Sequence, residues 1–178
     1  MLIQLILVAI ATNVNQTRAM TQSNKKKQPP ARILTLERYL PYRLSILSNR
    51  VSSMIAETYS DKFALSVTEW RIMAVLGEYP DVSADEVSSK TQIEKSILSR
   101  AINKLLSRHL VAREFDPSDK RRSMLNLTET GLSVYEEIVP VAYEMETELL
   151  ACFNKEEQEQ LSKLVDRLYD HAGKLADN

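Results

Sequence analysis

The sequence predicts a mainly α-helical fold that contains one small β-hairpin. Apolar residues recur at three- and four-residue steps through most of the chain, as on one face of an α-helix. A single pair of short strand-like segments flanks a stretch that is rich in turn-forming residues. The 178 residues include only 3 Gly and 6 Pro, which argues against a turn-rich all-β fold. The length fits one domain with an extension.

Composition excludes several classes of function. Hydrophobic residues make up 44% of the chain and charged residues 26%, as in ordinary globular proteins. Cys152 is the single cysteine, so the chain cannot form an intramolecular disulfide, and its two histidines leave little for metal binding. The sequence shows no glycine-rich phosphate loop and no spacing of a catalytic triad. We therefore expect no metal, no cofactor and no enzymatic activity.

Residues 1–35 are expected to be a flexible N-terminal extension. The apolar run from Leu2 to Ala11 is shorter than the roughly 20 residues that a membrane helix needs. No charged residue precedes Arg18, which makes a signal peptide a weak interpretation. Met20 is an alternative start. We expect a cytoplasmic protein with no membrane span.

Four helices are expected before the hairpin. The second should be capped by Ser66, and the third by Ser83 with Glu86 in a capping box. Their expected ranges are 36–59, the segment from Ser66 to about Gly77 and Pro80, 83–90 and 94–108.

The fourth helix has an apolar and a basic face. Ile97, Ala101 and Leu105, with Leu98 beside them, are expected to face inward. Lys95, Ser96, Ser99, Arg100, Asn103 and Lys104 are left outside. A short helix, a tight turn and a second helix with a basic face are typical of a DNA-binding helix-turn-helix. The alternative is a solvated helix face without a ligand.

A β-hairpin with a basic tip follows this helix. Its strands are expected at 110–115 and 123–127, and the turn between them carries Lys120, Arg121 and Arg122. Such a wing can reach the DNA minor groove, and Asp119 is expected to shape the turn and orient Arg121. The segment 95–122 holds eight basic and three acidic residues, a net charge of +5, whereas 129–178 holds four basic and twelve acidic residues, a net charge of −8. Such a charge distribution is expected when only one face meets a polyanion, and two solvated faces without a ligand are the alternative.

The C-terminal third predicts two amphipathic helices, with a kink or break at Pro140. Together with the first helix they carry more apolar surface than a small winged core needs. We therefore expect residues 36–62 and 129–178 to form a dimerisation module and residues 63–128 a winged helix-turn-helix module. An extra helical layer within one chain is the alternative.

Two segments resemble the MarR (multiple antibiotic resistance regulator) family of winged-helix transcription factors. They are DPSDKRRSMLNLTETG, from Asp116 to Gly131, and ADEVSSKTQIEKSILSRAINKLLSRHLVAR, from Ala84 to Arg113. The resemblance implies that Ser96, Ser99, Arg100 and Asn103 face the major groove and that Lys120 and Arg121 form the wing tip. Ile97 stands where the family often has Thr. His109 stands where it usually has Gly, at a position expected to need a positive φ.

The stretch LPYRLSILSNRVS, from Leu40 to Ser52, is similar to the subgroup that responds to aromatic carboxylic acids. The similarity implies an effector site between the modules. Its candidate residues are Tyr42, Arg43, Ser48, Arg50, Trp70, Met73 and His109. In the alternative interpretation the two arginines pair with acidic helices, Trp70 and Met73 are core residues, and His109 only ends a helix.

The combined prediction is a homodimeric repressor that binds palindromic operator DNA. A small aromatic carboxylate or phenol, or its coenzyme A thioester, would release it, and the regulated genes would serve aromatic catabolism. Two alternatives remain open. One is a thiol switch at Cys152, and the other is a winged helix that binds protein instead of DNA.

Overall fold

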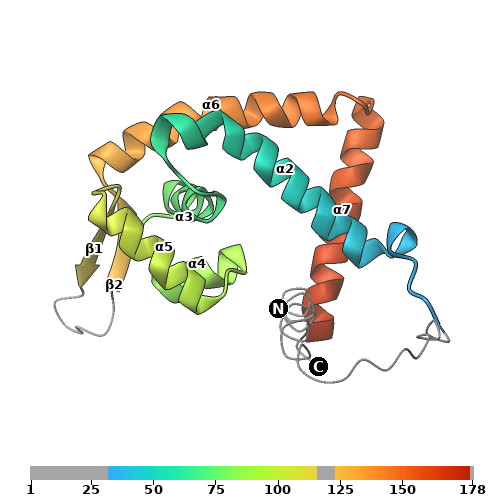
Figure 1. Cartoon of the computed structure of the whole chain (residues 1–178), viewed down its shortest axis with the longest axis horizontal. Coiled ribbons are helices and arrows are strands. Elements are labelled where there is room, and N and C mark those ends of the chain that lie inside the picture. The colour runs from blue at the N-terminus through green and yellow to red at the C-terminus, as the bar shows by residue number, and fades with distance from the viewer. Residues whose placement is uncertain (1–31, 116–122, 177–178) are drawn as a thin grey trace, which may run out of the picture.

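The computed structural model describes residues 32–115 and 123–176, and confirms a mostly helical fold with one small antiparallel sheet (Figure 1). Its elements, in chain order, are η1 Leu36–Arg38, α2 Leu40–Phe63, α3 Val67–Glu78, α4 Ala84–Thr91, α5 Lys95–Ser107, β1 Val111–Phe115, β2 Ser123–Leu127, α6 Glu129–Leu150 and α7 Lys155–Ala176. No helix within these ranges is long and apolar enough to cross a membrane.

Helices α3, α4 and α5 pack with the hairpin around one apolar cluster. Met73, Leu105 and Leu125 lie at its centre with no exposed surface. The inner face of α5 is formed by Leu98, Ile102 and Leu105, at steps of four and three residues. The expectation that Ile97 faces inward is wrong, because Ile97 is 39% exposed, whereas Ile102 is 1% exposed.

Both expected capping boxes are present. The Ser66 hydroxyl accepts a hydrogen bond from the Glu69 amide, and the Glu69 carboxylate accepts one from the Ser66 amide. Ser83 and Glu86 form the same arrangement at the start of α4. These caps satisfy amides that a helix leaves unpaired in its first turn.

Gly77 lies inside α3 and does not end it. A Cβ at this position would stand 2.5 Å from the Tyr135 ring of α6. Gly77 therefore lets α3 and α6 approach closely, which is a packing role that helix-ending statistics do not reveal.

The hairpin pairs β1 with β2 in antiparallel register, from Val111 opposite Leu127 to Phe115 opposite Ser123. An isolated bridge joins Val82 to Leu125 beside it. Next to that bridge, the Asp81 amide donates to the Asn126 side chain at 2.8 Å, and the Asn126 amide group donates to the Asp81 carboxylate at 2.7 Å. These contacts fix β2 to the loop between α3 and α4.

The long helices extend away from this core. In Figure 1, α6 leads from the hairpin to the opposite side of the molecule, where α7 turns back from its far end. Helix α6 is continuous through Pro140, so the structure does not contain the break that the sequence allowed. Helix α7 has no buried residue, and the described first half of α2 is also largely exposed.

Candidate nucleic-acid interface

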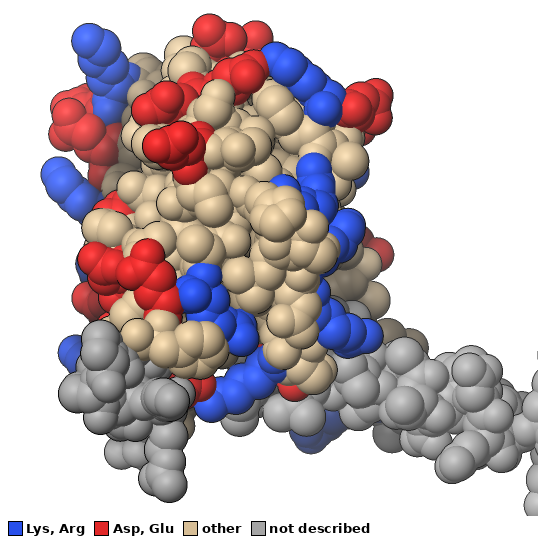
Figure 2. Space-filling view, turned by 90° about the vertical axis from the view of Figure 1, so that its left-hand side faces the viewer, with Lys and Arg blue, Asp and Glu red and all other residues tan. Residues whose placement is uncertain are grey.

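The outer face of α5 displays most of the residues that the sequence assigned to DNA. Lys95, Ser96, Ser99, Arg100 and Asn103 are all exposed. Figure 2 looks onto the left-hand side of Figure 1, which carries α5 and the hairpin. Lys and Arg side chains line the right-hand and lower parts of this face, whereas Asp and Glu side chains gather mainly at its top and left.

Glu94 caps the start of α5. Its carboxylate accepts hydrogen bonds from the amides of Ser96, at 3.0 Å, and Ile97, at 3.3 Å, and also from the Ser96 hydroxyl. The hydrogen bonds from Ser96 hold the pKa of Glu94 below its ordinary value. A negative charge therefore stands at the N-terminus of the helix, and the Ser96 hydroxyl is already engaged within the protein.

Two further groups on this face have partners within the protein. The Lys95 ammonium lies 2.8 Å from the Asp85 carboxylate of α4, and this hydrogen-bonded pairing raises the pKa of Lys95. The Arg100 Nε donates to the Ser96 carbonyl at 3.3 Å. Both side chains of the Lys95–Asp85 pair are about four-fifths exposed, so solvent screens their attraction strongly.

Lys104 has a different environment from the other assigned residues. Its ammonium lies 3.1 Å and 3.2 Å from the two carboxylate oxygens of Glu69, whose side chain is 1% exposed. Burial raises the pKa of Glu69, but hydrogen bonds from Ser66 and Lys104 outweigh this effect, so the pKa lies below its usual 4.5. The charged carboxylate therefore has its counter-charge on α5.

Arg108 follows α5 and was not singled out from the sequence. Its guanidinium donates to the carbonyls of Ala64, at 3.0 Å, and Phe63, at 2.5 Å, at the end of α2. Basic side chains often lie near the unpaired carbonyls at the end of their own helix. Arg108 instead follows α5 and lies at the end of a different helix, α2. Sequence spacing alone could not have placed the two together.

The chain leaves α5 through a tightly built junction. His109 has a φ of 55°, which confirms the expected left-handed conformation where the family usually has Gly. The Thr128 hydroxyl donates to the His109 carbonyl at 2.6 Å and accepts from the Gly131 amide at 3.0 Å. A Cβ on Gly131 would overlap the Leu110 carbonyl. The segment LTETG, from Leu127 to Gly131, therefore joins the hairpin to the start of α6, and its Thr128 and Gly131 make the contacts that hold this junction together.

The tip of the wing falls outside the described residues. Strands β1 and β2 are present as expected, but Asp119, Lys120, Arg121 and Arg122 lie in 116–122, which the structure does not describe. Their assignment to DNA stays a prediction.

One chain does not assemble the expected effector site. Tyr42, Arg43, Ser48 and Arg50 are exposed on the first half of α2. Sixteen residues separate Arg43 from Tyr59 on the same helix, or about 24 Å at 1.5 Å per residue. Met73 lies in the core, and His109 is exposed at the far end of α5.

Trp70 packs between two aromatic rings near the second half of α2. Its ring centroid lies 5.7 Å from that of Tyr59 and 5.9 Å from that of Tyr135. These distances are typical of favourable aromatic pairs within a core. The contacts of Trp70 therefore agree with the alternative in which it is a packing residue.

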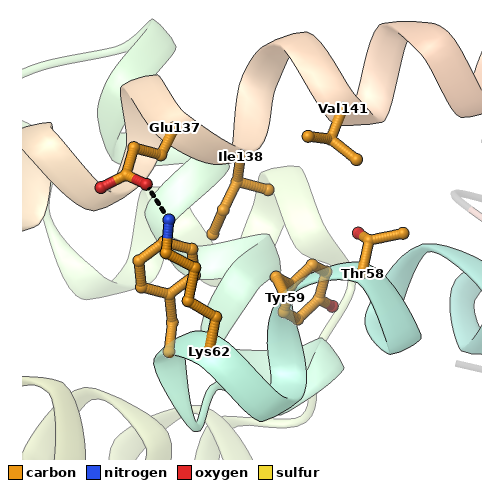
Figure 3. Close-up of a pocket in the computed structure, with 7 residues that line it drawn as sticks. Thr58, Tyr59, Lys62, Glu137, Ile138 and Val141 are labelled. Carbon is orange, nitrogen blue, oxygen red and sulfur yellow. Dashed lines mark hydrogen bonds and ion pairs between the residues drawn. The ribbon is translucent and has the colours of Figure 1, made fainter.

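A small hollow lies beside this cluster, between α2 and α6 (Figure 3). An ion pair between Lys62 and Glu137 lies beside it, and the buried Tyr59 forms part of its wall. Burial raises the pKa of Tyr59 to about 12, against the opposing charge of Arg71. The hollow has a volume of about 80 Å³. Small-molecule pockets usually measure roughly 300 Å³ or more, so this hollow does not hold an aromatic acid as it stands.

Comparison with known proteins identifies the family. A model of the MarR family matches residues 65–122. The crystal structure of a MarR/EmrR family transcriptional regulator from Acinetobacter sp. ADP1 superimposes with a TM-score of 0.73 at 30% sequence identity, over 79% of this chain and 99% of that one. The chain belongs to the MarR family.

Two further proteins are similar to this chain. The transcriptional regulator HosA of Escherichia coli O111:H- is 27% identical over 104 residues, which are 58% of this chain and 77% of HosA. BpsR of Bordetella bronchiseptica, whose DNA binding is regulated by 6-hydroxynicotinic acid, is 22% identical with a TM-score of 0.69, over 78% of this chain and 98% of that one. At that identity the likeness to BpsR shows the winged-helix fold alone.

Proposed function

We propose that this MarR family regulator is a cytoplasmic homodimeric repressor that binds palindromic operator DNA and is released by a small aromatic carboxylate or its coenzyme A thioester. The observation that carries the proposal is the exposed face of α5, with basic and hydrogen-bonding side chains beside a β-hairpin. No catalytic step is part of this function. Regulation of aromatic catabolism is the biological role that such an effector favours.

In this proposal α5 enters the major groove. Arg100 and Asn103 have the side chains that most often read guanine and adenine, and Ser99 can donate to a base or a phosphate. Lys95 would exchange its exposed Asp85 partner for a phosphate. The wing residues Arg121 and its neighbours would reach the adjacent minor groove.

The homodimer is supported by apolar side chains that a single chain leaves exposed. On α7, Leu164 is 51% and Val165 55% exposed, and Leu161 and Leu168 lie on the same face. Leu44 and Leu47 on α2 are exposed as well. Extended apolar surface of this kind marks an interaction site, and symmetry lets two copies cover it together.

The effector site would then be completed by the second chain. Arg43 and Arg50 lie on the exposed half of α2, among the apolar residues proposed to meet the partner. Guanidinium groups near such an interface suit a planar carboxylate. The regulation of BpsR by 6-hydroxynicotinic acid gives a precedent of the same chemical class within this fold.

The DNA part is tested by fluorescence anisotropy of the gene's own upstream DNA against a shuffled duplex. The parent protein should prefer the upstream DNA, and Arg100→Ala should weaken that binding about tenfold or more, the value of one good base contact. Lys163→Ala on α7 is the control, because it removes an equal charge from a distant helix. Equal affinity of the parent for the two duplexes would refute DNA-specific regulation.

The effector part is tested on the same complex with benzoates, hydroxycinnamates and their thioesters. One compound class should release the DNA, and Arg43→Ala should reduce this response without changing affinity for DNA. If the complex survives every compound, the aromatic effector is wrong while the DNA-binding proposal stands.

A thiol switch is a second candidate, because Cys152 is exposed just after α6. Peroxide would then weaken DNA binding by the parent and leave a Cys152→Ser variant unaffected. Identical behaviour of the two proteins would eliminate this candidate.

A further inference from the structure

The basic residues in and just after α5 do not all serve the same surface. Lys104 and Arg108 lie four residues apart, which places them one turn apart on the same side. Lys104 contacts α3, and Arg108 contacts the end of α2. Arg100, one further turn back, bonds only within its own helix among the hydrogen bonds of the described residues.

The contact between Lys104 and Glu69 joins α5 to a carboxylate that the protein holds in place. Glu69 is held by its capping box with Ser66, so its carboxylate has a fixed position on the first turn of α3. A buried carboxylate is costly unless it is paired with a charge and hydrogen-bonded. Lys104 lies within 3.2 Å of both oxygens, so it supplies this counter-charge from α5 and ties α5 to the first turn of α3.

The contact of Arg108 joins α5 to the first long helix. The carbonyls of Phe63 and Ala64 lie where α2 ends, and Ala64 adopts a left-handed conformation with a φ of 48°. A helix end leaves such carbonyls without intrahelical partners and carries partial negative charge. The planar guanidinium donates to both carbonyls, so it fixes direction as well as distance.

We propose that Lys104 and Arg108 are positioning residues that fix the orientation of α5 against α3 and α2, and that neither of them contacts a DNA phosphate. The proposal rests on the function proposed above. It assigns Lys104 a different role from the DNA contact expected from the sequence. Arg108 then joins α5 by hydrogen bonds to the helix that would carry the dimer contacts and the effector.

Salt dependence separates positioning from phosphate contact. Each phosphate contact that is lost reduces the slope of log affinity against log salt by about 1, whereas a misplaced helix leaves the number of released counterions unchanged. Anisotropy titrations of the upstream and the shuffled duplex over a series of salt concentrations therefore give the affinity for each duplex and the salt slope. The variants are Lys104→Met and Arg108→Gln, with Arg100→Gln as the comparison.

For Lys104→Met and Arg108→Gln we expect affinity for the upstream DNA to fall about tenfold, with an unchanged salt slope and unchanged affinity for the shuffled duplex. Arg100→Gln should lower the slope by about 1. Glu69→Gln should match Lys104→Met, and the double variant should be no weaker than either single one, because the two residues act as one contact. Lys104→Arg keeps the positive charge and should retain affinity for the upstream DNA. It is the control for a loss of binding that comes from unfolding of the Lys104→Met protein.

Three results would overturn the inference. A slope lower by about 1 in Lys104→Met or Arg108→Gln, with equal losses on both duplexes, would make that residue a phosphate contact. Unchanged affinity for the upstream DNA alongside a lower melting temperature would make the contacts merely stabilising. If the parent protein shows no preference for its upstream DNA, the proposed function fails first and this inference fails with it.

Discussion

Gly131, in the first turn of α6, packs directly against the backbone that leads into the hairpin. A side chain there would overlap the Leu110 carbonyl, and that carbonyl also accepts the Thr128 amide at 3.1 Å. Backbone groups of this kind cannot move aside without breaking the hydrogen bond. The requirement for glycine at this position is therefore steric, since its φ is not positive.

Gly131→Ala should lower the free energy of unfolding by about 2 kcal/mol or more, because overpacking against fixed backbone is costly. Gly173→Ala is the matched control. It lies in α7 with no neighbouring atom within 4 Å, and it should leave stability equal or raise it by about 0.5–1 kcal/mol. Urea denaturation of both variants measures the difference. A Gly131→Ala protein as stable as the parent would contradict the described junction.

Glu69 predicts a pH dependence of stability. Its pKa is lowered in the folded protein, so its contribution is fully present above the usual value of 4.5. That contribution is lost as the pH falls from 4.5 through the lowered folded pKa. The parent should therefore exceed Glu69→Gln in free energy of unfolding at pH 7, and the gap should shrink as the pH falls below 4.5.

Urea denaturation of the two proteins across this range tests the sign. Asp85→Asn is the control, because Asp85 belongs to an exposed ion pair that contributes little. A gap between parent and Glu69→Gln that widens at acid pH would contradict a lowered pKa.

At the scale of single elements, local sequence signals predicted most of the fold. The serine caps of α3 and α4 and both strands lie where they were expected, because these features depend on neighbouring residues. Ile97 was wrongly assigned to the inner face of α5, because the apolar residues of this helix fit two overlapping stripes along its surface. Pro140 does not break α6, although local statistics allow a break there.

The residue after the end of α5 and its cap, His109, is in a strained backbone conformation. His109 adopts a left-handed conformation that costs most residues about 1 kcal/mol or more. His109→Gly should therefore raise the free energy of unfolding by up to about 1 kcal/mol. His171→Gly, inside α7, should lower it by about 1 kcal/mol, because Gly weakens a helix interior. Thermal melting compares the two, and a stability loss in both would refute strain at His109.

The site was harder to predict than the elements. The exposed face of α5 followed from helical periodicity, but periodicity gave no sign that Lys104 pairs with a buried carboxylate 35 residues away. The partner of Arg108 is more distant still, at 44 and 45 residues. Contacts of this range depend on tertiary packing, which no local pattern encodes.

At the scale of the whole molecule and among the described residues, α7 and the first half of α2 leave their apolar faces uncovered, whereas the second half of α2 packs against α6 and α3. Helix α7 exposes its apolar face throughout, and α2 does the same over its first half. In the proposed homodimer, Arg43 and Arg50 lie on this exposed part of α2. Their surroundings would be supplied by the surface that covers these helices.

Leu164→Lys should dissociate the proposed homodimer, because it places a charge on the apolar face of α7. Asp170→Lys introduces the same side chain on the opposite face and should leave the dimer intact. Sedimentation velocity at micromolar concentration distinguishes the two states. A monomeric parent, or a Leu164→Lys variant that remains dimeric, would contradict the assignment of this face.

In the proposed repressor, two copies of this MarR family chain recognise operator DNA through paired α5 helices. Nuclease protection of the gene's own upstream DNA tests it most directly. We expect one protected region with two inverted half-sites about 34 Å apart, one turn of the duplex, which the Leu164→Lys variant fails to protect at the same concentration. Uniform protection without a preferred site, or no protection at all, would contradict the account.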